Sequence, residues 1–298
     1  MSVLNIGTCT DRRGFGSLWV LTQSLLASQA DETEINIVVL HDGLSNRQIC
    51  ALTEAGKVRE RTNIEFHLVD LNERFSGGGP HSVMTYARFL LPEYFKSTLL
   101  YLDTDIVVKD DLSHLMRLPL SVPIGAVEAQ TVGDSNCRLF FSKKRVDAST
   151  PYFNAGVLLM DGRQWLSSDI FGELVKIGEQ EKWDFPTFDQ TLLNYYFQGS
   201  FVRLSKKYNT LAYASAECDM NEVIENAAIV HFISRPKPWE IFGSVNLNFA
   251  LYKRVVDIQS AKRAPFSIYD IPYSVKRVEG YLPSYVKCAR ARYFTSTS

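Results

Sequence analysis

Short apolar runs alternate with amphipathic stretches through the first half of the chain, and this alternation is what most constrains its fold. Residues 3–9, 35–40, 64–69 and 98–102 have the length and apolar content of buried strands. Between them, residues 17–29 place several leucines on one helical face, and Ser45 is a typical N-cap for a helix extending to about residue 61. Alternation of this kind favours a largely parallel sheet covered by helices. We therefore expect an α/β fold.

The second half of the chain has longer connections. Residues 124–127, 153–160 and 229–233 are predicted strands, and residues 83–95, 162–181 and 188–198 are predicted helices, the first strained by Pro92. The polar stretch 128–151 is interpreted as a functional loop because so long a gap is rarely filler. The glycine-rich segment 76–80 cannot lie inside a helix or strand. We expect both segments to close over a bound substrate.

Composition excludes several classes of protein. The chain carries 32 Lys and Arg against 33 Asp and Glu, so its total charge gives no indication of nucleic-acid binding. The five cysteines are odd in number and lack a Cys-x-x-Cys pair, which favours reduced thiols in a cytoplasmic protein. The first residues do not resemble a signal peptide, and the longest apolar runs are too short to span a membrane.

Five residues follow predicted strands, where open α/β sheets bind their ligands: Asp11, Asp103, Asp105, Glu128 and His231. The sequence Asp103-Thr104-Asp105 is the most informative of these, because two carboxylates one residue apart suit a divalent cation that bridges them to a diphosphate. An alternative remains at this point. The same apolar run followed by Asp-x-Asp resembles the haloacid-dehalogenase-like phosphatases, in which the first Asp attacks phosphorus, so Asp103 is also a candidate nucleophile.

Five segments in order resemble glycosyltransferase family 8. They are Thr-Tyr-Ala-Arg at 85–88, Tyr-Leu-Asp-Thr-Asp at 101–105, Phe-Asn-Ala-Gly-Val-Leu at 153–158, Asp189-Gln190, and His231 followed by Lys237-Pro238-Trp239. The resemblance covers about residues 3–240 and is greatest to bacterial galactosyl- and glucosyltransferases of lipopolysaccharide biosynthesis. It implies a GT-A fold, a Rossmann-like mixed sheet flanked by helices. Residues 1–245 would form the nucleotide-sugar and acceptor domain.

The resemblance implies a metal-dependent, retaining transfer of galactose or glucose from a UDP-sugar to a hydroxyl of a glycolipid or surface-polysaccharide acceptor. Mn²⁺ or Mg²⁺ would be held by Asp103, Asp105 and His231. Asp189 and Gln190 would be the catalytic residues beside the donor sugar. The implied donor-binding residues are Cys9, Asp11, Arg88, Asp103, Thr104, Asn154, Ala155, Gly156 and Lys237. The family usually has glycine where this chain has Ser234, and often has two acids in the segment where this chain has Thr10-Asp11-Arg12-Arg13.

Residue chemistry favours one mechanism within that class. An amide such as Gln190 is a poor nucleophile, so we expect the acceptor to attack from the side on which the diphosphate leaves. Two other functions stay open: the phosphatase with Asp103 as nucleophile, and a non-catalytic member of the family that only binds nucleotide. The sequence does not distinguish galactose from glucose, identify the acceptor, or exclude self-glycosylation on one of 14 tyrosines.

The end of the chain differs in charge from the rest. Residues 251–298 contain nine Lys and Arg against three Asp and Glu, a charge of +6 that leaves −7 on residues 1–250 to give the total of −1. We interpret residues 246–298 as a basic, aromatic, helical extension. A helix from Leu282 would place Leu282, Tyr285, Val286, Ala289 and Tyr293 on one face, with Arg290 and Arg292 flanking it and Lys287 on the opposite side.

Such a helix is typical of peripheral contact with the cytoplasmic face of an anionic membrane, although packing on the enzyme is the alternative. We expect removal of the residues after Gly280 to weaken vesicle binding and to spare activity on a soluble acceptor.

Overall fold

The computed structural model describes residues 2–70, 83–258 and 278–294, and the chain divides into two compact units. The first unit comprises Met1–Arg12, Asp31–Asp103 and Leu112–Lys206, and the second comprises Arg13–Ala30, Thr104–Asp111 and Lys207–Ser298. Short 3₁₀ helices, η1 (Arg12–Gly14) and η4 (Lys206–Tyr208), lie where the chain passes between units. The predicted loop at 76–80 falls outside the described residues.

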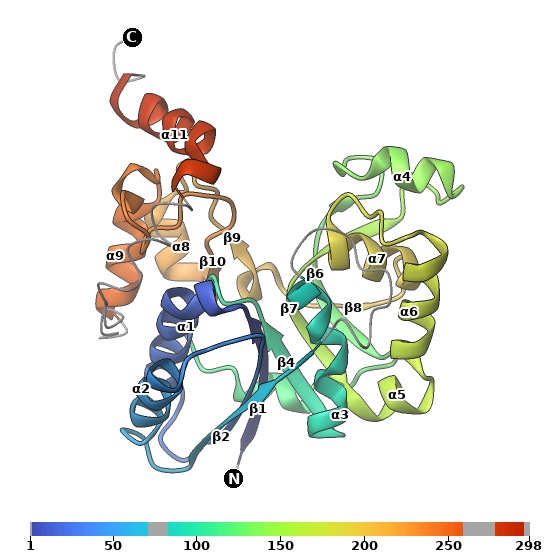
Figure 1. Ribbon diagram of the computed structural model, residues 1–298, viewed down its shortest axis with the longest axis horizontal. Helices are drawn as coiled ribbons and strands as arrows, with labels where there is room; N and C mark the ends of the chain where they lie inside the picture. The colour runs from blue at the N-terminus through green and yellow to red at the C-terminus, as the bar shows by residue number, and fades with distance from the viewer. Residues whose placement is uncertain (1, 71–82, 259–277, 295–298) are drawn as a thin grey trace. The chain divides into compact units, whose positions relative to one another are not determined.

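The first unit is built on a seven-stranded mixed sheet in the order β3-β2-β1-β4-β7-β6-β8 (Figure 1). Its strands are β1 (Val3–Thr10), β2 (Glu34–His41), β3 (Thr62–Leu68), β4 (Thr98–Leu102), β6 (Ile124–Thr131), β7 (Pro151–Asp161) and β8 (Val202–Arg203). The first four pair in parallel, as the strand–helix alternation predicts, whereas β7 runs antiparallel to both β4 and β6. The predicted mixed sheet is confirmed.

Helices cover the sheet on both sides, with α2 on one side of the strands and α3 on the other (Figure 1). They are α2 (Asn46–Gly56), α3 (Leu91–Phe95), α4 (Arg138–Lys143), α5 (Gly162–Ser167), α6 (Ile170–Gln180) and α7 (Phe188–Phe197), with 3₁₀ helices η2 (Val83–Leu90) and η3 (Ser113–Arg117). The largest core cluster joins α5, α6 and α7 to β6 and β7 through buried side chains such as Trp165, Leu174 and Phe153. The cluster also includes Tyr101 and Ala155, so it extends to the segments of β4 and β7 that carry predicted site residues.

Local sequence explains several helix boundaries. The predicted N-cap Ser45 is confirmed, because its side chain and that of Gln48 form a reciprocal capping box. Residues 83–95 are not one strained helix: a 3₁₀ helix ends at Leu90, and Pro92 lies in the first turn of α3, where its missing N–H costs nothing. Residues 162–181 form two helices separated near Asp169, which caps the second.

The predicted loop at 128–151 is wrong in part. The strand β6 continues to Thr131, β7 begins at Pro151, and α4 folds between them. Val132, Cys137 and Phe141 are buried together with Tyr152 in a small core of their own. These apolar side chains are few and far apart in the sequence, so the segment is polar on average. Packed together, they nevertheless bury one face of α4.

The second unit contains a three-stranded sheet in the order β5-β10-β9. Its elements are α1 (Phe15–Ser28), β5 (Ile106–Val108), β9 (Thr210–Leu211), α8 (Met220–Asn226), β10 (Ile229–His231), η5 (Gly243–Val245), α9 (Phe249–Ile258) and α11 (Leu282–Phe294). Residues 229–233 were predicted as the last strand, and the pairing ends at His231. A buried cluster including Val20, Val107, Val230 and Leu251 holds the unit together.

The predicted C-terminal helix is confirmed as α11, but its faces differ from the prediction. Tyr285 is buried with Cys288, whereas Leu282, Val286 and Tyr293 are exposed. Among the described residues, no helix combines the length and hydropathy needed to cross a bilayer.

Candidate active site

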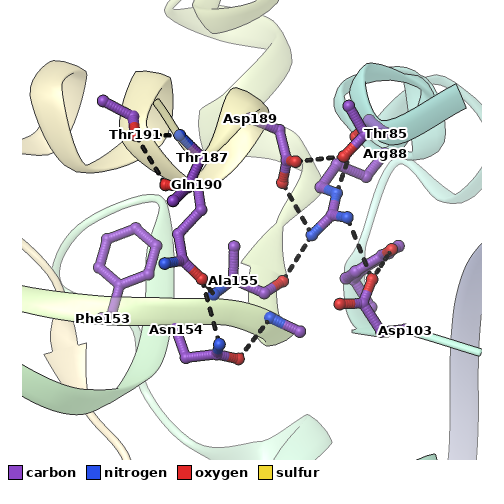
Figure 2. Close-up of polar contacts among 12 residues, drawn as sticks. Thr85, Arg88, Asp103, Phe153, Asn154, Ala155, Thr187, Asp189, Gln190 and Thr191 are labelled. Carbon is purple, nitrogen blue, oxygen red and sulfur yellow. Dashed lines mark hydrogen bonds and ion pairs between the residues drawn. The ribbon is translucent and has the colours of Figure 1, made fainter. Parts of the chain in front are cut away.

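Arg88 is the centre of a buried polar cluster in the first unit (Figure 2). Its Nη2 lies 3.0 Å from Oδ1 of Asp103, directly after β4, and its Nη1 lies 3.0 Å from Oδ2 of Asp189 in the first turn of α7. Nη1 also donates to the carbonyl of Ala155 on β7 (2.7 Å) and Nε to that of Thr85 (3.0 Å). One guanidinium thus ties together three elements.

Burial and charge act against each other in this cluster. The side chains of Arg88 and Asp189 are only 6% and 7% exposed. Burial raises the pKa of Asp189 to about 6, although the charge of Arg88 and a hydrogen bond from Thr85 lower it. Burial disfavours the charge of Arg88, but Asp103 and Asp189 outweigh it and raise the pKa of this guanidinium above its ordinary value. The cation therefore stays charged between two carboxylates.

The side chain of Gln190 is fixed by three hydrogen bonds, and Figure 2 shows those to Asn154 and Ala155 on β7. Its Oε1 accepts from the backbone N–H of Ala155 and from Nδ2 of Asn154, each at 3.1 Å, and its Nε2 donates to Oη of Tyr152 at 3.1 Å. Both lone pairs of the amide oxygen are therefore occupied. Asn154 in turn accepts from the N–H of Gly156 (3.0 Å), so the small residues of β7 hold the amide groups in place.

Asp105, His231 and Lys237 form a second polar cluster within the second unit. His231 Nε2 lies 3.0 Å from Asp105 Oδ1, and Lys237 Nζ lies 2.6 Å from Asp105 Oδ2 and donates to the carbonyl of Phe232 at 2.5 Å. Burial alone would raise the pKa of Asp105, but the charges of Lys237 and His231 and their hydrogen bonds hold it well below its ordinary value. Asp105 is thus kept as a carboxylate.

The donor set in this cluster fits a divalent metal ion. The Nδ1 of His231 lies 2.9 Å from Asn209 Oδ1, an oxygen that can only accept a hydrogen bond, so the hydrogen lies on Nδ1 and, in the neutral imidazole, Nε2 is the nitrogen left to ligate beside a carboxylate. Asp103, the other carboxylate of the Asp-Thr-Asp sequence, belongs to the first unit and lies two residues earlier in the chain. Imidazole together with carboxylates suits a metal such as Mn²⁺.

The remaining predicted residues have different surroundings. Burial raises the pKa of the Cys9 thiol near Arg88 and Asp103, so it stays protonated. Burial, and next the charge of Asp11 just after β1, raise the pKa of Asp42, whose carboxylate accepts a hydrogen bond from the N–H of Arg12 (3.2 Å). Thr104 is the single residue between the two clusters in the chain. Glu128 forms a surface ion pair with Arg203 (2.6 Å), and this contact accounts for an acid at that position without a role in the site.

Four residues that sequence reasoning missed support those it identified. Thr85 donates to Asp189, and Tyr101 donates to Asp103 while the guanidinium of Arg88 lies 4.3 Å from its ring centroid. Asn209 orients His231, and Tyr152 orients Gln190. Thr85 and Tyr101 lie inside the motifs at 85–88 and 101–105, so those motifs could have indicated them. Asn209 and Tyr152 have no comparable sequence signal.

Comparison with solved structures identifies the class of enzyme. A crystal structure of the galactosyltransferase LgtC in complex with donor and acceptor sugar analogues matches with a TM-score of 0.70 and 26% identity, covering 88% of this chain and 98% of LgtC. The apo structure of the bifunctional glycosyltransferase WbbM matches in fold with a TM-score of 0.67 at 20% identity, covering 85% of this chain and 52% of WbbM. The expected GT-A fold of glycosyltransferases is confirmed.

The family follows from the sequence. The model of glycosyl transferase family 8 matches residues 8–242, and the chain belongs to that family. General stress protein A of Bacillus subtilis is 27% identical over 259 residues, 80% of this chain and 87% of that protein. The lipopolysaccharide 1,3-galactosyltransferase of Salmonella typhimurium is 29% identical over 174 residues, 54% of this chain and 50% of that protein. Glycosyltransferase GlyF of Streptococcus pneumoniae is 30% identical over 55% of this chain, which spans 40% of GlyF.

Proposed function

We propose that this family 8 glycosyltransferase moves galactose or glucose from a UDP-sugar to a hydroxyl of a glycolipid or surface-polysaccharide acceptor, with retention at the anomeric carbon. The observation that carries the proposal is the sequence Asp103-Thr104-Asp105, in which each carboxylate is already engaged by a cation, Arg88 on one side and Lys237 on the other. Partly buried carboxylates that are each paired with a cation suit a metal ion and a diphosphate better than a solvated strand end does.

We assign the metal to Asp103, Asp105 and His231, with Mn²⁺ or Mg²⁺ as the ion. When bound, such an ion neutralises the diphosphate and stabilises it as a leaving group. Lys237 would place a positive charge beside the same diphosphate, because its ammonium is paired with the proposed metal ligand Asp105. Arg88 would hold Asp103 in place while contacting the donor. The remaining donor-binding assignments are Cys9, Asp11, Thr104, Asn154, Ala155 and Gly156.

Attack on the front face is the mechanism that the contacts of Gln190 and Asp189 support. Both lone pairs of the Gln190 oxygen are used, and the oxygens of Asp189 are engaged by Thr85 and Arg88, so neither side chain is free to form a covalent glycosyl intermediate. The two residues would instead position the sugar, while a diphosphate oxygen takes the proton of the incoming acceptor hydroxyl. Positioning and charge stabilisation then supply the rate enhancement.

We also propose that residues 246–298 are a basic extension of a catalytic domain spanning 1–245 and that α11 contacts an anionic membrane. Leu282, Val286 and Tyr293 are 53%, 40% and 60% exposed, and Lys287 and Arg290 are exposed on the same helix. Apolar side chains beside basic ones suit the interface of an anionic bilayer. The five free cysteines suit a reducing compartment, so we place the enzyme at the cytoplasmic face.

The test is release of nucleoside diphosphate from a panel of nucleotide sugars, with Mn²⁺ or with EDTA. We expect UDP from UDP-galactose or UDP-glucose with Mn²⁺ only, and an α-linked product by NMR if an acceptor is supplied. Asp105→Asn should abolish release, whereas Asp110→Asn, which changes a surface carboxylate paired with Lys109, should not. Inorganic phosphate released from simple phosphoesters without a nucleotide sugar would favour the phosphatase. UDP binding without any transfer to a range of acceptors would favour the non-catalytic alternative.

A further inference from the structure

The carboxylate of Glu240 fixes the backbone at Lys237 through a hydrogen bond. Its Oε2 accepts the backbone N–H of Lys237 at 2.9 Å, and its Oε1 pairs with the guanidinium of Arg235. The Glu240 side chain is only 7% exposed, and Lys237 itself is buried. The ammonium of Lys237 is held by Asp105 and by the carbonyl of Phe232. A shift of the Lys237 backbone would therefore move the ammonium relative to these two partners.

The C-terminal helix α11 reaches the same carboxylate. Oη of Tyr285 donates to Glu240 Oε2 at 3.2 Å, and Tyr285 is 6% exposed. One residue before the helix, the ring of Tyr281 lies 4.8 Å from the guanidinium of Arg235. The contacts to Glu240 and to its partner Arg235 therefore come from Tyr285 in the first turns of α11 and from Tyr281 just before it.

The end of α11 makes a second connection to the Lys237 segment. Arg292 Nη1 donates to the carbonyl of Asn246 at 3.0 Å, and Asn246, which is fully buried, donates from Nδ2 to the carbonyl of Pro236 at 2.7 Å. Between these points, the buried Sγ of Cys288 lies 3.4 Å from the carbonyl of Ala214. The helix is thus attached on both sides of Lys237 in sequence, through Pro236 and through Glu240.

From these contacts we infer that α11 is a positioning element for the donor's diphosphate, acting through Glu240 on Lys237. This rests on the proposed function, in which Lys237 meets the diphosphate of a UDP-sugar. The contacts argue against the expectation that removing the residues after Gly280 spares activity on a soluble acceptor. Tyr285 is a positioning residue, since it touches Glu240 and acts on the ligand only through the Lys237 backbone.

Tyr285→Phe in the full chain is the decisive variant, because it removes one hydroxyl and keeps the buried ring. We would measure the dissociation constants of UDP and of uridine with Mn²⁺ present, alongside the KM for the UDP-sugar. Loss of a hydrogen bond to a charged acceptor predicts a UDP affinity about tenfold weaker. The uridine affinity stays unchanged, because uridine carries no diphosphate. Tyr293→Phe is the matched control on the same helix, with a side chain that is 60% exposed, and should match the wild type.

Each outcome decides a different point. Equal UDP affinity in wild type and Tyr285→Phe overturns the role of α11 while leaving the proposed function standing. An equal loss for UDP and uridine also overturns it, because a general loosening of the fold would not select the diphosphate. If the wild type binds UDP no more tightly than uridine, Lys237 does not meet a diphosphate, and the proposed function fails together with this inference. Glu240→Gln keeps the shape of the side chain but removes its charge, so it should weaken UDP binding more than Tyr285→Phe does.

Discussion

Replacing Arg88 with glutamine removes the cation that two carboxylates share. Asp189 is nearly as buried as Arg88, whereas Asp103 is 27% exposed, so most of the cost arises at Asp189. Removing one partner of a buried ion pair costs about 3–5 kcal/mol, because the other charge is left without compensation. We expect Arg88→Gln to lower the free energy of unfolding by this amount at pH 8.

The cost should depend on pH through Asp189. Burial raises its pKa to about 6 even with Arg88 present, and since Arg88 lowers this pKa, the variant's value lies higher still. A carboxyl whose pKa is raised by folding contributes stability that is complete below about pH 4, its ordinary pKa, and is lost as the pH rises through the folded value. In the variant that loss continues to higher pH, at about 1.4 kcal/mol per pH unit. The deficit relative to wild type therefore grows between pH 6 and pH 8.

Urea unfolding of both proteins at pH 6, 7 and 8 measures this difference directly. The control is Arg88→Gln combined with Asp189→Asn, compared with Asp189→Asn alone. That pair lacks the titrating group, so its difference should be nearly flat with pH. A deficit for Arg88→Gln that is constant over the three pH values would refute the role given to Asp189. A deficit below about 1 kcal/mol at pH 8 would mean that the carboxylates are not shielded from water.

Three further changes test other parts of the molecule. Tyr152→Phe removes the acceptor for Gln190 Nε2 and should reduce kcat by about three- to tenfold, the free energy of one hydrogen bond; it should also lower the melting temperature, because the buried hydroxyl contacts Thr187 as well. Ser45→Ala breaks the capping box of α2 far from the site and should cost about 1 kcal/mol in urea unfolding at unchanged kcat. Gly243→Ala would place a Cβ 2.4 Å from the carbonyl oxygen of Pro238 and 2.5 Å from that of Lys237, so it should weaken UDP binding in a titration as well as lower stability.

The sequence predicted the strand ends of the site better than the contacts between them. Buried strands end in residues that cannot continue an apolar run, so Asp103 and His231 could be placed at or beside strand ends from their neighbours alone. The resemblance implied that Arg88 binds the donor, but its pairing with both Asp103 and Asp189 was found only in the structure, because residues separated by 15 and by 101 positions give no local signal. The mixed order of the sheet came from the resemblance, since strand–helix alternation by itself favours a parallel sheet.

The residues that orient His231 and Gln190 were missed for a physical reason. Asn209 and Tyr152 act by accepting a hydrogen bond in a buried place, and asparagine and tyrosine are common in turns and strands without any such role. Their function depends on which partner the fold brings within about 3 Å, a property of tertiary packing that periodicity does not contain. The helix α4 was missed because Phe141 and its neighbours bury a small core inside a segment that is polar on average.

The faces of α11 show how a helical projection can mislead about a tyrosine. Counting apolar side chains puts Tyr285 on the same face as Leu282 and Val286, yet its hydroxyl requires a partner once it is buried, and Glu240 supplies one. The helix therefore divides its apolar residues between a buried face that braces Lys237 and an exposed face next to Lys287 and Arg290. If both proposals for α11 hold, membrane contact and donor binding draw on the same helix. Any change that vesicle binding makes in UDP affinity is then matched, by linkage, by an equal change that UDP makes in vesicle affinity.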